Sequence, residues 1–182
     1  MVSLFSLWMP ILLSAVVCWI AGSLIWVVMP HHKKDFAPLD QEEQARNALR
    51  GLKPGLYNIP HVADPSKVTD EDRQRFAAGP VGFLTIMPDG LPNMGKNLVQ
   101  QMIYYIVVGV IVAYVASVTL PSGADYLKVF QVVGTTAWLG FGFGAMQDSI
   151  WFGKPWSYNF KILIDALIYA LLSAGIFGWL WP

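Results

Sequence analysis

The side chains of this chain that could do chemistry lie at the ends of its apolar segments. Asp165 stands inside such a segment, about two helical turns from its start, and an ionisable group there is a functional candidate because its burial costs free energy. Lys161 precedes it by four residues, a spacing that allows the two to pair on one helix face. Asp148 and Gln147 end the preceding segment and are expected to join the same polar cluster. The cluster is interpreted either as a proton or cation relay or as a salt bridge that anchors the helix end.

The three histidines of the sequence, His31, His32 and His61, lie outside the apolar segments. A haem between membrane helices takes its axial ligands from those helices, so an intramembrane bis-histidine haem is not expected. The sequence identifies no cofactor. Together with Asp35 the histidines are candidates for a metal site, but no HExxH, CxxC or paired Glu-x-x-His spacing accompanies them, so no metal is predicted.

The positions after the first apolar segment have a simpler interpretation. Residues 31–34 read His-His-Lys-Lys directly at the predicted membrane exit. Basic side chains at that level attract anionic lipid headgroups. We therefore expect Lys33 and Lys34 to contact headgroups.

The sequence contains no fingerprint of a catalytic site. A nucleophile elbow, a phosphate-binding glycine loop and a dinucleotide fingerprint are all missing. Glycines alternate over residues 140–144, but this stretch lies inside an apolar segment and lacks the strand-then-helix context of a nucleotide site. We therefore predict that the protein is not an enzyme. The remaining enzymatic hypothesis is a site at the inner membrane surface formed by the three histidines.

Composition and the placement of charge indicate which solvent surrounds the chain. Of the 182 residues 55% are hydrophobic and 13% are charged, whereas about a quarter are charged in a soluble domain. The 12 basic residues balance 12 acidic ones, so net charge gives no reason to expect a nucleic-acid partner. Eighteen of these charges lie between positions 31 and 96, and the one cysteine has no intrachain partner. These features exclude a soluble globular protein, a disordered chain and a disulfide scaffold, and they predict an integral membrane protein.

Four apolar segments are long enough to cross a bilayer, because a helix of about 20 apolar residues spans the hydrocarbon core. Backbone inside lipid must satisfy its own hydrogen bonds, which favours helices. The predicted fold class is an all-α integral membrane protein, a four-transmembrane-helix bundle that forms a single membrane domain over residues 1–182. The predicted spans cover about residues 8–29, 98–120, 128–147 and 160–181, and residues 30–97 form a long loop between the first two.

Basic residues indicate the orientation of the bundle. The loop over residues 30–97 carries nine Lys or Arg residues, and Lys154 and Lys161 lie at the same predicted side of the membrane. Near the opposite ends of the spans only Lys128 is present. Since basic residues stay in the cytoplasm, we expect a cytoplasmic loop and both termini on the outer, periplasmic side.

The loop contains signals for short helices. Asp40 with Glu43 and Thr69 with Asp72 both have the spacing of a capping box. This spacing predicts one helix over residues 41–50 and a second that begins just after Thr69.

The rest of the loop is expected to have little regular structure. Residues 53–60 are so rich in turn formers that neither a helix nor a strand is predicted there, and residues 81–87 form either one short strand or an apolar strip against the membrane. A segment of this size does not bury an independent core. We expect it to fold against the inner ends of the spans or against another subunit, either as a docking surface or as a packed loop with solvated charges.

Small residues recur at intervals of four along three of the spans. This spacing allows helices to approach closely and predicts a tightly packed bundle, compatible with further helices from other chains. The predicted helix-packing residues are Gly140, Gly144, Ala166, Ala170, Ala174, Gly178, Ser14, Cys18 and Gly22.

Five segments of the sequence carry a resemblance to known proteins: residues 29–35, 92–98 and 149–156, and the closing segments 165–170 and 177–182. Together they resemble an uncharacterised family of bacterial four-helix inner-membrane proteins of unknown function. This resemblance implies a multi-pass protein of the bacterial inner (plasma) membrane. It implies no catalytic or binding residues.

Two functional hypotheses follow from the sequence. The first is a non-enzymatic membrane protein that acts as a homo-oligomer or as an accessory subunit of an inner-membrane complex. Its expected partners are the lipid bilayer and other membrane subunits or copies of itself, with no nucleic acid. The alternative is a small oligomeric transporter or channel whose polar path on the third and fourth spans is formed by Asp165, Asp148, Gln131 and Thr135.

Overall fold

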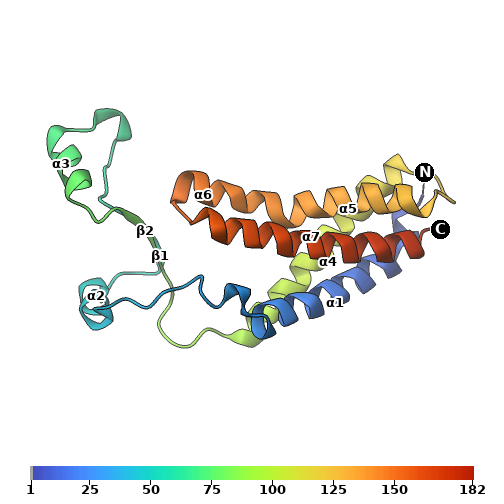
Figure 1. Cartoon of the computed structure of the whole chain (residues 1–182), viewed down its shortest axis with the longest axis horizontal. Coiled ribbons are helices and arrows are strands. Elements are labelled where there is room, and N and C mark those ends of the chain that lie inside the picture. Colours follow the sequence, from blue (N-terminus) through green and yellow to red (C-terminus); the bar gives the residue numbers. More distant parts are fainter. Residues whose placement is uncertain (1) are drawn as a thin grey trace.

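The computed structural model describes residues 2–182, which form a bundle of four long helices and an extended loop region at one end of it (Figure 1). Each of the four helices is long and apolar enough to cross a membrane, as the sequence predicts. They cover Leu4–Val28, Met94–Thr119, Tyr126–Phe152 and Trp156–Trp179.

The long helices are not uniform along their length. The first consists of a 3₁₀ turn (Leu4–Leu7), α1 (Trp8–Ser23) and a π-helical turn (Leu24–Val28). The second and fourth are α4 (Met94–Thr119) and α7 (Trp156–Trp179). The third consists of α5 (Tyr126–Gly142), a 3₁₀ turn (Phe143–Ala145) and α6 (Met146–Phe152), so it runs further than the predicted end at residue 147.

Local signals explain where these helices begin and end. The Asn93 side chain caps α4 by accepting a hydrogen bond from the backbone N–H of Lys96 at 3.0 Å. Pro121 follows α4, and a proline cannot continue the helical hydrogen-bond pattern. Gly153 has a φ of +68°, which allows the tight turn between α6 and α7.

Both ends of the chain lie at the same end of the bundle (Figure 1). The backbone carbonyl of Pro182 accepts hydrogen bonds from Gly123 N–H at 2.7 Å and from the Ser122 hydroxyl at 3.0 Å. The indole N–H of Trp181 donates to the Pro121 carbonyl at 2.9 Å. These bonds fasten the last residues to the turn between α4 and α5.

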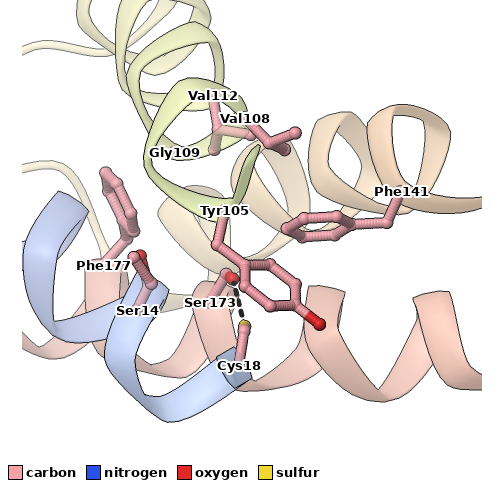
Figure 2. A pocket seen from close by; sticks show the side chains of 10 residues that line it. Ser14, Cys18, Tyr105, Val108, Gly109, Val112, Phe141, Ser173 and Phe177 are labelled. Atoms are coloured by element: carbon pink, nitrogen blue, oxygen red, sulfur yellow. Dashed lines mark hydrogen bonds between the residues drawn. The ribbon is translucent and has the colours of Figure 1, made fainter. Parts of the chain in front are cut away.

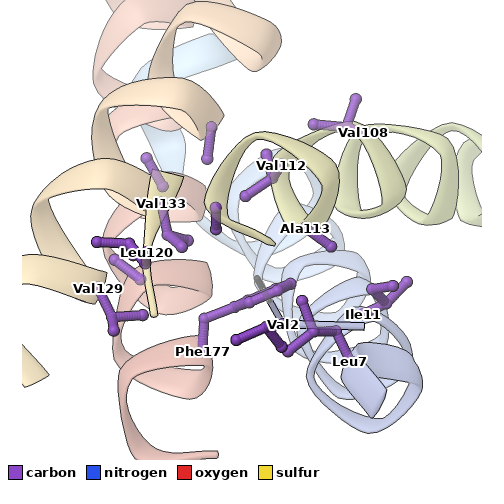
Figure 3. Packing of buried hydrophobic residues seen from close by; sticks show 14 residues of the cluster. Val2, Leu7, Ile11, Val108, Val112, Ala113, Leu120, Val129, Val133 and Phe177 are labelled. Atoms are coloured by element: carbon purple, nitrogen blue, oxygen red, sulfur yellow. The ribbon is translucent and has the colours of Figure 1, made fainter. Parts of the chain in front are cut away.

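An apolar cluster fills the end of the bundle where the termini lie (Figure 3). Phe177 and Leu7 are its largest fully buried side chains. They pack among branched residues from the first helix, α4 and α5, and burying one such side chain stabilises the fold by about 1.5–3 kcal/mol. The cluster includes Val2, Ile11, Val108, Val112, Leu120, Val129 and Val133.

Small residues let α5 and α7 approach closely. Ala166, Ala170 and Ala174 of α7 are buried in the bundle. A Cβ added at Gly142 of α5 would lie 2.7 Å from the Cβ of Ala166, and one added at Gly134 would lie 3.3 Å from that of Ala174. The pairing of α5 with α7 therefore depends on side chains no larger than a methyl group.

The expected glycine pair of the third span is only partly correct. Gly140 faces Val108 of α4, whereas Gly144 has open space around the position of its missing Cβ. The close contact with α7 is made instead by Gly142, which lies between them. The pattern fails because the chain leaves α-helical geometry after Gly142, so the spacing of four no longer keeps residues on one face. Gly178, at the other end of α7, packs against the ring of Tyr126.

The loop contains two short helices and a hairpin. Helix α2 covers Glu42–Leu49 and α3 covers Asp70–Ala78. Strands β1 (Gly55–Ile59) and β2 (Gly82–Ile86) pair antiparallel.

Three expectations for the loop can be compared with this structure. The capping box of Thr69 and Asp72 is confirmed. The one at Asp40 is wrong, because the N-cap residue of α2 is Gln41 and no side chain caps the helix. The prediction that residues 53–60 form no strand is also wrong. β1 is a strand because it pairs with β2, which follows α3 in the sequence. The local composition of residues 53–60 does not reveal this distant partner.

The loop has almost no interior. Between residues 33 and 100, all of which the structure describes, Pro60 alone is buried. Most of the loop extends away from the bundle (Figure 1). Its first residues contact α7, where Asp35 pairs with Lys161 and Phe36 packs on Tyr158, and the hairpin adds an edge-to-face contact of Phe83 with Phe152 at 5.4 Å. The expectation that the loop folds against the ends of the spans therefore holds only for these contacts, and the alternative, packing against another subunit, stays a prediction.

The packing of α5 on α7 predicts a difference between two neighbouring glycines. Gly142→Val should lower the free energy of unfolding by about 1–3 kcal/mol, because the added methyl groups overpack the contact with Ala166. Gly144→Val, the matched control, faces open space and should change it by no more than about 0.5 kcal/mol. Denaturation of the two variants in detergent measures the difference. Equal destabilisation would contradict this account of the interface.

Candidate functional site

The candidate site lies where the chain leaves the first helix and meets α7. Pro30–His32 form a 3₁₀ turn directly after that helix. Asp165 of α7 is only 2% exposed. One carboxylate oxygen (Oδ1) lies 3.0 Å from His31 Nε2, and the other (Oδ2) lies 2.8 Å from His32 Nε2. A single buried carboxylate is therefore bound by two adjacent imidazoles.

A second carboxylate completes the network. Asp35 Oδ2 lies 2.6 Å from His32 Nδ1, and Lys161 of α7 donates to Asp35 Oδ1 and to the His31 carbonyl. Hydrogen bonds from Lys161 and then from His32 hold the pKa of Asp35 below its ordinary value, so this group is a carboxylate at neutral pH.

The expected pairing of Lys161 with Asp165 is therefore wrong. Their spacing on α7 permits contact, but the lysine side chain reaches out of the helix to Asp35 and the chain after α1. Asp165 is left to the two histidines. The partners of both charges come from residues 31–35, which follow the first helix, and a pattern within one helix cannot detect them.

The hydrogen bonds restrict the protonation of the histidines. Both ring nitrogens of His32 face carboxylate oxygens, which only accept. His32 satisfies both contacts either as an imidazolium or with a metal ion in place of one proton. His31 donates from Nε2 to Asp165, while its Nδ1 is buried without a partner among the described residues.

Aromatic rings hold the His32 imidazole in place. The ring of Trp26 stacks on it with a centroid distance of 3.9 Å and an interplanar angle of 4°. The ring of Tyr158 lies at an edge-on angle 6.4 Å away. These contacts and the hydrogen bond to Asp35 fix the plane of the imidazole, so its Nε2 points at Asp165.

The other acidic and amide residues predicted for this cluster lie elsewhere. Asp148 of α6 forms an ion pair with Lys154 at 2.7 Å. Gln147 is exposed. Gln131 and Thr135 line a depression of about 240 Å³ on the surface of α5 and α7. These residues and Asp165 do not line one path, so the expected channel lining is not assembled within one chain.

The remaining candidates are exposed. His61 lies beyond β1 and bonds to the Asn58 side chain at 2.9 Å, away from the other two histidines. Lys33 and Lys34 project from the turn that follows His32. Of the three histidines considered as candidates for a metal site, only His31 and His32 lie together, and Asp165 is the third residue of that group.

Sequence reasoning treats Asp165 and the two histidines as separate features, although they form one cluster. The predicted topology indicates that these residues can meet. The exit of the first span and the start of the fourth span lie at the same side of the predicted bundle, and Asp165 is only about two turns inside. Nothing in the sequence indicates that Trp26 belongs to the site, because its contact with His32 depends on the direction of the chain after Met29.

A second group of polar side chains lies in the middle of the bundle (Figure 2). The predicted packing residues Ser14 and Cys18 of α1 line it, and the Cys18 thiol lies 3.5 Å from the Ser173 hydroxyl of α7. The enclosed space is too small for a water molecule.

Gly22 lies one turn further along α1, where the absence of a Cβ admits two phenol hydroxyls. A Cβ there would lie 2.7 Å from the Tyr105 oxygen and 3.1 Å from the Tyr169 oxygen. The small residues of α1 therefore serve close packing, and this region is not the functional site.

No family model, curated protein or solved structure matches the chain. These comparisons assign no role to any residue. The functional argument therefore depends on the arrangement of the side chains.

The network predicts that Lys161 contributes more to the stability of the fold than the nearby Lys154. Lys161→Met should lower the thermal unfolding midpoint several times more than Lys154→Met, because it removes the cation beside Asp35, whose side chain is 5% exposed. Lys154 and Asp148 are both substantially exposed, and such a pair contributes about 0–1 kcal/mol. Thermal unfolding in detergent compares the two variants. Similar midpoints would contradict the role given to Lys161.

Proposed function

We propose that the protein is a multi-pass protein of the bacterial inner membrane that acts as a non-enzymatic subunit, either of a homo-oligomer or of a larger membrane complex. The observation that carries this proposal is the loop without an interior, held at a fixed point of an apolar four-helix bundle. The argument has three steps: the membrane, the loop and the attachment between them.

The proposed membrane orientation rests on the four apolar helices and on the placement of basic residues. The termini share one end of the bundle, as four crossings require. Nine Lys or Arg residues lie in the loop at the other end. By the positive-inside rule that end faces the cytoplasm, and the termini face the periplasm.

The loop supplies the reason to propose a partner. A two-stranded hairpin is marginally stable at best in water, and here no helix of the loop covers it with buried side chains. One face of the hairpin presents Leu56 (83% exposed) and Phe83 (55% exposed), with Val81 beside it. Exposed apolar side chains of this kind on a structured hairpin are typical of an interaction surface. We propose that the hairpin packs against another subunit.

The buried network supports the same proposal, because it fixes where the loop leaves the bundle. Lys161 and Asp165 of α7 bind Asp35, His32 and the His31 backbone. The start of the loop is thereby attached to α7. A docking segment with a fixed attachment loses less conformational entropy on binding than a free one.

The orientation can be tested by cysteine labelling. Cys18 is buried, so a Cys18→Ala background can carry single cysteines at Ser122 and Asp89. A membrane-impermeant maleimide should label the Ser122→Cys variant in spheroplasts, and the Asp89→Cys variant only after the membrane is opened. The reverse pattern would contradict the proposed orientation.

The assembly can be tested by native mass spectrometry after gentle extraction. The wild-type chain should appear in a complex with further copies or other membrane proteins. Leu56→Asp should release it as a single chain, because a charge on the hairpin face opposes burial. Leu91→Asp is the matched control, since Leu91 is 98% exposed and lies off the hairpin, and it should leave the complex intact.

Two results would contradict the subunit proposal. One is a wild-type protein that is a stable single chain with no bound partner. The other is equal loss of the complex in Leu56→Asp and Leu91→Asp, which would remove the hairpin as the contact.

A further inference from the structure

We propose that His31, His32 and Asp165 form a binding site for a divalent transition metal, with Zn²⁺ as the best match. The proposal does not require the subunit role proposed above, although the same residues attach the loop to the bundle. It lies at the inner end of the bundle, between the exit of the first helix and α7.

The geometry places three ligand atoms around one point. One ligand atom from each of the three residues lies within 4.8 Å of the others. The contacts of Asp165 with His31 and His32 measure 3.0 and 2.8 Å. In a tetrahedral zinc site with bonds of 2.0–2.1 Å, neighbouring ligand atoms are about 3.3 Å apart. The two contacts with Asp165 are a few tenths of an ångström shorter than this spacing, whereas other ligand atoms are up to 4.8 Å apart, so the side chains must also shift toward one another to enclose the ion.

The hydrogen bond to Asp35 prepares His32 as a ligand. When the Nδ1–H of His32 donates to Asp35 at 2.6 Å, the neutral imidazole has its lone pair on Nε2. That lone pair faces a carboxylate oxygen of Asp165, so two acceptors meet at 2.8 Å. A cation must lie between these two atoms, either a proton or a metal ion. A metal ion there would bind both His32 Nε2 and the Asp165 oxygen.

The surroundings match those of metal-bound histidines in proteins. Such a histidine commonly donates its second ring N–H to a carboxylate, which fixes the ring and raises its basicity. Asp35 has this position, and Lys161 orients Asp35 from the other side. Trp26 stacks on the His32 ring and restrains its rotation. Asp35 is thus a positioning residue and not a ligand.

The donor set selects the class of metal. Two imidazole nitrogens and one carboxylate oxygen suit Zn²⁺, Co²⁺ or Ni²⁺, whereas Mg²⁺ and Ca²⁺ prefer sites made of oxygen. Three protein ligands and one water complete a tetrahedral zinc site. His31 is 28% exposed on its side chain, whereas His32 and Asp165 are nearly buried. Water and metal therefore reach the site from the side of His31.

Metal binding would join two parts of the chain that are distant in sequence. His31 and His32 belong to the start of the loop, and Asp165 belongs to α7. A bound ion would therefore strengthen the attachment of the loop to the bundle. A ligand that binds only the folded state raises its stability, so zinc should raise the unfolding temperature.

The test is equilibrium dialysis of the tag-free, metal-stripped protein against zinc, followed by elemental analysis. About one zinc per chain should bind to the wild type. His32→Gln should abolish this binding, and Asp35→Asn should weaken it about 10–100-fold while leaving the stoichiometry unchanged. His61→Gln is the matched control, because His61 is an exposed histidine away from the cluster, and it should bind zinc as the wild type does.

A measurement on the unmodified protein protects the test against variants that fail to fold. Zinc should raise the thermal unfolding midpoint of the wild type, magnesium should not, and Co²⁺ should give the intense visible absorption of a tetrahedral site. A wild-type protein that takes up no zinc would overturn the proposal. Zinc binding that survives His32→Gln but is lost in His61→Gln would also overturn it.

Discussion

A carboxylate buried inside an apolar helix requires compensation, and the structure at the end of the bundle opposite the termini is organised around this requirement. Asp165 is enclosed by α7 and the exit of the first helix, where an unpaired charge would cost several kcal/mol. Both of its oxygens are bound by imidazoles. Asp35 and Lys161 then bind the outer side of this pair, so that acidic and basic groups alternate through the network.

The bundle brings these groups together through small residues. Alanines on α7 and glycines on α5 bring those two helices into close contact. On α1, Ser14, Cys18 and Gly22 leave space for Tyr105, Tyr169 and Ser173. With the first helix held against α7, the turn at Pro30–His32 emerges beside Asp165. Helix packing thus determines which polar groups can meet, and the polar groups determine where the loop begins.

The sequence predicts the parts of this architecture that depend on composition and local pattern. Four helices of spanning length follow from uninterrupted apolar runs, and the cap at Thr69 follows from a spacing of three residues. Contacts between distant segments are harder to predict. The pairing of β1 with β2, the role of Gly142 and the union of His32 with Asp165 each depend on how elements pack, which a pattern within one element does not contain. The spacing of Lys161 and Asp165 is compatible with an ion pair, but Lys161 pairs instead with Asp35, which follows the first helix.

The central claim is that Asp165 holds the start of the loop against α7. Hydrogen–deuterium exchange measured by mass spectrometry tests it most directly, comparing the wild type with Asp165→Asn and with Asp148→Asn as the control carboxylate. Loss of the Asp165 charge should speed exchange in the segment around residues 30–35, while α4 remains as protected as in the wild type and the control shows no change. Equal protection of that segment in the wild type and in Asp165→Asn would contradict the claim.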